Sequence, residues 1–175
     1  MPAPRLQVVA PLYYAFVQAA PPGDGGGAEA DAFWALQGVM GQLRDLFIPA
    51  LDQEGPNGVH TTLKRLSETL RGADAALWGH LQGLSLDPHF YALEWLSTMF
   101  ARVFPLPELL RLWDYLFASG PDLLAALTRV SLAMLVHPPV RQALLAADFA
   151  GAMHTLQDFP AVDVVELVRA AERLR

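Results

Sequence analysis

Cysteine is absent from the 175 residues of this chain. Its absence excludes disulfide bonds, thiolate metal sites and cysteine nucleophiles. Lysine is nearly absent too, because Lys64 is the only lysine among twelve basic residues. Acidic residues are in excess, with a net charge of −6 and a pI near 5.2. No basic field is available to hold a phosphate backbone, so nucleic acid is not an expected partner.

Strand patterns and long apolar runs are also lacking. No run of alternating β-branched residues is bounded by turn residues, which argues against a sheet. The longest apolar stretch, 123–136, is interrupted by Arg129. It is shorter than the roughly 20 residues that cross the hydrocarbon core of a bilayer. We therefore expect no transmembrane segment.

The composition is that of a folded domain, with 53% hydrophobic and 17% charged residues. Proline, glycine and aspartate divide the chain into helix-length pieces, and we expect about ten helices in one all-α domain spanning 1–175. Two prolines and four glycines crowd residues 21–27, which predicts a flexible surface loop at 21–28. The expected helices are 6–20, 29–47, 59–70, 75–81, 88–103, one ending at 117, 121–136, short ones from 140 and 148, and a last one near the C-terminus.

Several helix boundaries and faces follow from local signals. Asp87 is followed directly by Pro88, and Asp158 lies two residues before Pro160, so each is expected to cap a helix. The helix at 121–136 is apolar nearly all round, so we expect it to be buried. The four tryptophans lie on four different helices, and at least three of them are expected to be structural. The other expected core stripes are Phe33/Leu36/Met40/Leu43/Phe47, Leu93/Leu96/Phe100/Val103, Leu109/Leu112/Trp113/Leu116 and Val164/Leu167/Val168/Ala171/Leu174.

No recognisable catalytic, cofactor or metal motif is present. The five histidines do not pair at the i, i+4 spacing of a helical metal site. The glycine-rich stretch at 23–27 lacks the lysine of a phosphate-binding loop, and no Gly-x-Ser-x-Gly elbow occurs. From the residues alone, the chain is an acidic all-helical domain for which we predict no catalytic, cofactor-binding or metal-binding residue.

Several segments follow one another in an order and spacing that carry a family resemblance. They are Glu29–Trp34 with Met40, Leu77 with His80-Leu81, Phe90–Trp95, Phe104–Leu106 and Leu112–Ala118. Together they resemble the C-terminal part of a TBC domain, the all-helical domain of Rab GTPase-activating proteins. The similarity is strongest over residues 29–137 and weaker at both ends. The resemblance implies a compact orthogonal array of helices.

In that family, an arginine from the motif IxxDxxR and a glutamine from YxQ act together on the GTP of the bound Rab. Neither motif occurs in this sequence. Aligned on Ala10-Pro11, the family's glutamine falls on Ala3 and its tyrosine on Met1. Arg5 and Gln7 are out of register, so neither takes a finger role. Glu94 stands where the family commonly has arginine, which alters a salt bridge or the surface that faces the Rab.

The resemblance therefore implies a regulator of a GTPase rather than an enzyme, and a chain that is inactive by itself. Its implied partner is a Rab-type small GTPase or an adaptor protein, and its implied location is cytoplasmic, at endomembranes through that partner. The alternative is a non-catalytic helical interaction module, and no feature supports an unrelated enzyme. A missing N-terminal lobe would leave an exposed apolar patch, expected on the first helix at Leu12, Tyr13 and Phe16.

Overall fold

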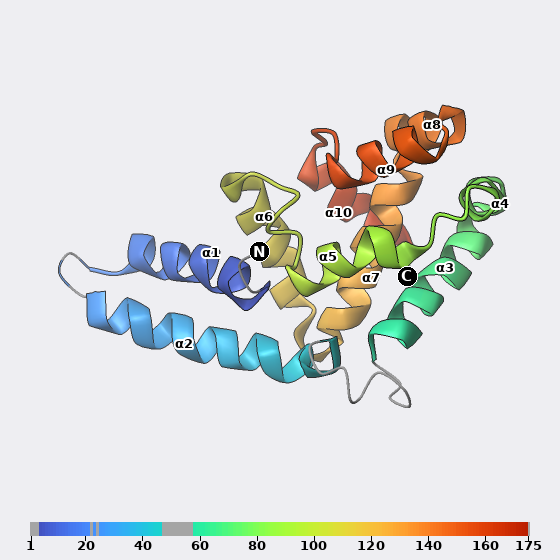
Figure 1. Ribbon diagram of the computed structural model, residues 1–175. Helices are drawn as coiled ribbons and strands as arrows, with labels where there is room; N and C mark the ends of the chain where they lie inside the picture. Colours follow the sequence, from blue (N-terminus) through green and yellow to red (C-terminus); the bar gives the residue numbers. More distant parts are fainter. Residues whose placement is uncertain (1–3, 22, 24, 47–57, 175) are drawn as a thin grey trace.

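The computed structural model describes residues 4–21, 23, 25–46 and 58–174, which form ten α-helices and no strand (Figure 1). The all-α prediction is confirmed. Helices α1 and α2 lie side by side and form an arm on one side of the molecule, and the remaining helices form the body. The helices are α1 (Pro4–Ala19), α2 (Gly25–Gln42), α3 (Val59–Ala73), α4 (Ala75–Gly83), α5 (Ala92–Ser97), α6 (Leu106–Ala118), α7 (Leu123–Val136), α8 (Pro138–Ala146), α9 (Phe149–Gln157) and α10 (Val164–Arg173), with short 3-10 turns η1 (Arg44–Leu46), η3 (Pro88–Phe90) and η4 (Gly120–Asp122).

Helix α7 runs through the centre of the body. Nine of its residues are buried, and α3, α5, α6, α8 and α10 all pack against it (Figure 1). The prediction of a buried helix at 121–136 is confirmed, although its first residues form the turn η4. The stripes predicted on α6 and α10 also face the core, with Leu109, Leu112, Trp113 and Leu116 buried on the first and Val164, Leu167 and Ala171 on the second.

The starts of α2 and α10 are among those that differ from the prediction. Helix α2 begins at Gly25, so the loop expected at 21–28 is shorter; positions 22 and 24 lie outside the described residues. Glycine lowers helix stability by about 1 kcal/mol, but Ala28 and Ala32 pack in the core and stabilise the helix. Asp158 does not cap the last helix. Asp163 does, because its carboxylate accepts a hydrogen bond from the Val165 N–H at 2.7 Å.

Asp87 caps as predicted, accepting a hydrogen bond from the His89 N–H at 2.8 Å. The helix that follows is much shorter than predicted, because α5 ends at Ser97 rather than continuing to Val103. Met99 and Phe100 take left-handed backbone conformations, with φ of 50° and 63°. The Phe100 N–H reaches the Trp95 carbonyl at 2.9 Å, and the Met99 N–H reaches that of Leu96. This is a Schellman C-cap, built without the usual glycine.

Tertiary packing holds this corner between α5 and α6. Met99 and Phe100 are both fully buried. Trp113 of α6 donates its indole N–H to the Met99 carbonyl at 2.8 Å, which satisfies a buried acceptor that the helix itself leaves free. Trp95 is also buried, and Trp78 is half-buried with its Nε1 donating to Ser67 at 3.0 Å. Three of the four tryptophans are therefore structural, as predicted.

A polar clamp fastens α8 to α4. The Asp74 carboxylate caps α4 by accepting from the Leu77 N–H at 3.0 Å, and it forms a two-point ion pair with Arg141 of α8. Nearby, His80 Nε2 lies 3.1 Å from the Ala147 carbonyl. The Arg141 guanidinium lowers the pKa of Asp74 below its ordinary value of 3.8. This clamp therefore adds stability only while Asp74 is ionised.

The indole hydrogen bond at the corner has a matched test. We expect Trp113→Phe to lower the free energy of unfolding by about 1–3 kcal/mol, because a buried carbonyl loses its donor. Trp34→Phe makes the same chemical change on a side chain that is 71% exposed, and should stay within about 0.5 kcal/mol of the unsubstituted chain. Urea denaturation followed by circular dichroism gives both values, and equal effects would contradict the role assigned to Trp113.

The clamp predicts a pH-dependent effect of Asp74→Asn. Asparagine also caps helices, so this substitution mainly removes the ion pair. A carboxylate with a lowered pKa stabilises the fold above its unfolded pKa and loses that effect as pH falls through its folded pKa. We therefore expect a lower melting temperature for the variant at pH 7, and a smaller difference as the pH falls below about 4. A difference that does not depend on pH would exclude the ion pair as its cause.

Candidate functional site

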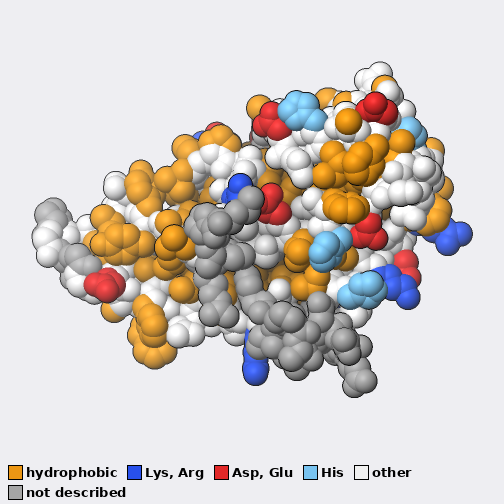
Figure 2. Space-filling model, in the orientation of Figure 1, with side chains coloured by type: hydrophobic (Ala, Val, Ile, Leu, Met, Phe, Trp, Pro, Cys, Tyr) orange, Lys and Arg blue, Asp and Glu red, His pale blue; other side chains and the backbone are white. Residues whose placement is uncertain are grey.

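The arm formed by α1 and α2 carries apolar side chains on two faces. Its inner face holds Val8, Leu12, Ala28 and Ala32, all buried where the two helices meet. Its outer face is apolar as well, and Figure 2 shows orange side chains spread over this end of the molecule. The exposed large side chains on it are Leu6 (58%), Tyr13 (45%), Tyr14 (45%), Val17 (39%), Phe33 (50%) and Trp34 (71%).

Helical geometry explains why α1 cannot bury all of these residues. Leu6, Tyr13 and Val17 are spaced by seven and four residues, which places them on one stripe of the helix. Val8 and Leu12 lie on the opposite side of the helix and are buried. No charged residue occurs from Leu6 to Ala19. A helix that is apolar on both sides and uncharged is typical of one covered from both sides.

The prediction for this patch was correct for one residue of three. Tyr13 is exposed, Phe16 is half-buried and Leu12 is only 4% exposed, so Leu12 was wrongly placed. The prediction for α2 was also partly wrong, because Phe33 was expected in the core and lies outside. There it packs edge-to-face on Trp34, with ring centroids 5.4 Å apart. Leu36 and Met40 are half-buried and Leu43 is buried, whereas Phe47 lies outside the described residues.

The two residues considered as finger substitutes both belong to α1. The Gln7 side chain is half-buried, and its Oε1 atom is buried with no hydrogen-bond partner among the described residues. The amide oxygen of Gln7 is therefore not exposed to solvent, where it could orient a water molecule. Arg5 lies on the first turn of α1, and its side chain lies outside the described residues.

Glu94 on α5 forms an ion pair with Arg102, 3.0 Å away in the corner between α5 and α6. Both side chains are about 40% exposed, so the pair lies at the surface. The negative charge of Glu94 is opposite to that of the arginine common at this position in the family that the sequence resembles. Glu94 therefore takes part in a salt bridge within the corner itself.

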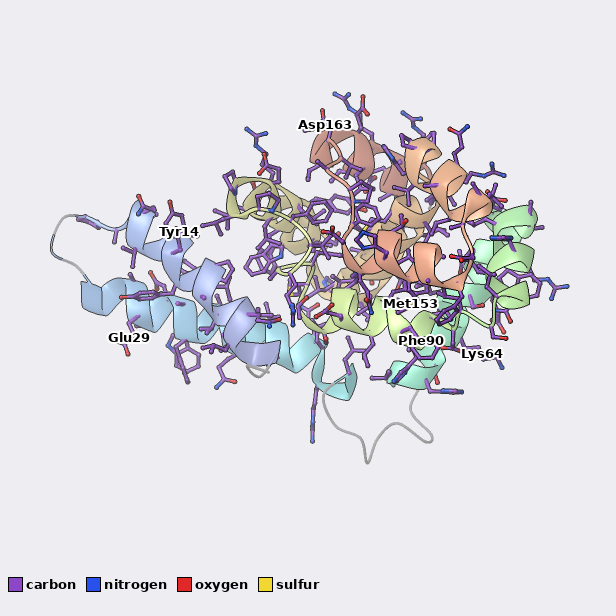
Figure 3. The ribbon with its side chains drawn as sticks, turned by 45° about the horizontal axis from the view of Figure 1, so that its top comes forward. Tyr14, Glu29, Lys64, Phe90, Met153 and Asp163 are labelled. Atoms are coloured by element: carbon purple, nitrogen blue, oxygen red, sulfur yellow. The ribbon has the colours of Figure 1, made fainter. Side chains whose placement is uncertain are left out.

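A cleft of about 460 Å³ opens at the other end of the molecule, between α3 and the turn η3. Figure 3 labels Phe90 and Lys64 there, far from Tyr14 and Glu29 on the arm. Its lining mixes His60, Lys64 and His89 with Asp87, so charges of both signs meet in it. No group of three or more potential metal ligands occurs among the described residues.

Within the described part of the chain, no single helix is long and apolar enough to cross a membrane. The pair Gly120–Val136 and Pro138–Ala146, bent by 62°, meets the length and composition requirement only when taken together.

The outer face of the arm can be tested with a dye that binds exposed apolar surface. We expect Phe33→Ser combined with Trp34→Ser to lower the fluorescence of bound anilinonaphthalene sulfonate, because the two largest exposed rings on α2 are lost. Both are solvent-exposed, so the free energy of unfolding should change by no more than about 0.5 kcal/mol per site. Phe149→Ser, on α9, removes an isolated ring that is 45% exposed and should leave the signal unchanged. Equal losses in both proteins would show that the arm is not the apolar site.

Comparison with known proteins gives a consistent result. The family model for the Rab-GTPase-TBC domain matches residues 8–140. TBC1 domain family member 13 of Mus musculus is 36% identical over 169 residues, which cover 97% of this chain and 41% of that protein. TBC1 domain family member 5 of Homo sapiens is 36% identical over 107 residues, which cover 61% of this chain and 13% of that protein.

A solved structure shares the fold. The crystal structure of the Ypt/Rab-GAP domain of Gyp1p superposes with a TM-score of 0.80 at 22% identity, over 97% of this chain and 57% of that chain. The sequence of GTPase-activating protein GYP1 of Saccharomyces cerevisiae is 30% identical over 86 residues, which cover 49% of this chain and 13% of that protein. This chain therefore spans about two fifths of the length of the mouse relative and somewhat more than half of the solved domain.

Proposed function

This chain belongs to the Rab-GTPase-TBC domain family, and from that premise we propose that it forms the C-terminal part of a domain that stimulates GTP hydrolysis by a Rab-type small GTPase. The observation that carries the proposal is the family match over residues 8–140. The order of the segments from Glu29 to His137 supports it. On this proposal the chain is a regulator that acts on an enzyme.

We also propose that the 175-residue polypeptide does not accelerate GTP hydrolysis by itself. Phosphoryl transfer spreads negative charge over the γ-phosphate, and a well-placed arginine that meets this charge is worth about 10³–10⁵ in rate. A glutamine is needed to orient the attacking water. The sequence contains neither IxxDxxR nor YxQ. Gln7 is half-buried and its Oε1 has no hydrogen-bond partner among the described residues, so it is poorly placed to replace the glutamine.

The role left to this polypeptide is structural. Helices packed around α7 would hold a rigid surface against the GTPase, and the residues that act on the nucleotide would come from a separate segment. The apolar outer face of the arm would then pack against that segment. Through its GTPase the protein would work on the cytoplasmic side of an endomembrane.

Single-turnover GTP hydrolysis by a panel of Rab proteins, with this polypeptide in excess, tests the proposal. We expect no measurable acceleration, whereas the Rab-GAP domain of Gyp1p, as positive control, should accelerate its own substrate GTPase. Acceleration that disappears in Arg5→Ala or Gln7→Ala would show that α1 supplies a finger and that the polypeptide is active. Binding of the polypeptide to the GTP-loaded Rab proteins, followed by fluorescence anisotropy, would show whether the surface for the GTPase is retained.

A second candidate function is a helical module that binds another protein without acting on its nucleotide, such as an adaptor. The exposed rings of Tyr13, Tyr14, Phe33 and Trp34 favour it, because aromatic side chains are enriched at protein interfaces. Under this reading, the double substitution of Phe33 and Trp34 by serine would abolish partner binding. Rab binding would be absent in the unsubstituted chain.

A further inference from the structure

The side of α2 that faces away from the core is exposed along most of the helix. Its residues recur at spacings of three, four and seven, which places them on one stripe opposite the buried Ala28 and Ala32. Figure 3 shows Tyr14 of α1 and Glu29 of α2 on opposite edges of the arm, so this stripe is separate from the exposed one on α1. We call it the α2 stripe, and it consists of Ala30, Phe33, Trp34, Gln37 and Gly41, with Arg44 in the turn η1 that follows the helix.

The α2 stripe is raised in one half and flat in the other. Phe33 and Trp34 are 50% and 71% exposed, and their rings pack edge-to-face on each other. Further along the helix, a Cβ atom placed on Gly38 or Gly41 would meet no other atom within 4 Å. The two rings therefore project from the surface beside a stretch of bare backbone that is open to receive a ring.

Opposite charges mark the two ends of the same helix. Glu29 and Asp31 are exposed near its start, and Arg44 is exposed just beyond its end. None of the ion pairs found within the described ranges involves any of these three residues. Two such helices packed in the same direction would bring like charges together, whereas two packed in opposite directions would bring unlike charges together.

A twofold axis through Gln37 matches these features to one another. Such a rotation brings the residue that lies n positions after Gln37 opposite the residue that lies n positions before it in a second copy. Gly41 then faces Phe33, with Trp34 beside it, and Arg44 comes next to Glu29. The two Gln37 amides meet at the axis, where each can donate to and accept from the other. The α2 stripe is therefore complementary to itself in shape and in charge.

We propose that this chain forms a reversible homodimer in which the α2 stripes of two copies pack antiparallel about an axis at Gln37. The 18 residues of α2 extend over about 27 Å, and contact along one such helix buries less than the roughly 800 Å² per partner of a standard interface. We therefore expect a Kd on the order of 10–100 µM. The inference goes beyond the proposed GTPase-directed function, and the exposed stripe of α1 is left for the separate segment named there.

Sedimentation velocity over about 1–300 µM tests the inference. We expect the average mass to rise from that of the 19.1 kDa chain towards twice that value. Trp34→Ser should raise the Kd at least about tenfold, because the largest exposed ring of the stripe is lost. Tyr13→Ser removes a 45% exposed ring from α1, on the other side of the arm, and should leave the Kd unchanged. Circular dichroism at about 1 µM, where the chain is monomeric, verifies that each variant is folded.

A charge swap tests the antiparallel arrangement. Glu29→Arg and Arg44→Glu should each raise the Kd about tenfold, because each places like charges opposite one another at two symmetry-related contacts. Combining the two substitutions restores unlike charges and should return the Kd to within about threefold of that of the unsubstituted chain. Arg111→Glu makes the same charge change at an exposed position on α6 and should have no effect on the Kd.

The absence of cysteine allows the position of the axis to be tested by cross-linking. Gln37→Cys places one thiol of each copy at the axis, within reach of the other. Oxidised glutathione accepts the two electrons and leaves as two thiols, so a disulfide-linked dimer should form readily. Gln142→Cys places the single thiol at an exposed position on α8 and should give little linked dimer under the same conditions. Non-reducing electrophoresis measures both yields.

Several results would overturn the inference. A chain that stays monomeric up to about 300 µM has no such dimer. A dimer that persists in Trp34→Ser, or that is weakened equally by Tyr13→Ser, contacts elsewhere. A folded double charge variant that stays weakened, or equal cross-linking of Gln37→Cys and Gln142→Cys, would exclude the antiparallel axis at Gln37. A monomeric chain that binds phosphatidylcholine vesicles, and loses that binding in Trp34→Ser, would assign the stripe to a bilayer surface instead.

Discussion

Helix α7 can exist in water only when other helices enclose it. Nearly every side chain from Leu123 to Val136 is apolar or small, and α3, α5, α6, α8 and α10 each cover part of its surface. Those covering helices are amphipathic or short, so each is stabilised by burying its apolar side against its neighbours. The clamp between Asp74 and Arg141 fastens α8 to α4 at one end of this arrangement. Burial around one helix thus fixes the positions of the corner and the cleft.

Sequence patterns predicted the helices well wherever a residue's effect is local. Proline, aspartate and glycine mark most starts and ends, and the apolar spacing on α6 and α10 shows which side faces the core. The failures have tertiary causes. The end of α5 at Ser97 was missed because Met99 adopts a left-handed conformation that sequence rules assign to glycine, and its burial and the Trp113 indole favour that conformation only in the folded protein.

The candidate site was predictable to a smaller extent. Family resemblance located the region and drew attention to Glu94, whereas the partner of Glu94, Arg102, became evident only from the corner that brings the two together. The outward position of Phe33 could not be read from its spacing, because α2 places it on the side away from α1.

At Met99 and Phe100 the left-handed backbone favours glycine, whereas packing in the core favours a large apolar side chain. Glycine would relieve the backbone, since left-handed geometry costs other residues roughly 1–2 kcal/mol each. Glycine would also leave a cavity, since both side chains are fully buried and truncating such a residue costs roughly 2–5 kcal/mol. Larger side chains have no room, and polar ones would lack partners. Most single substitutions of Met99 or Phe100 should therefore destabilise the fold. In distant relatives that keep this corner, the two residues should change only together with the residues packed around them.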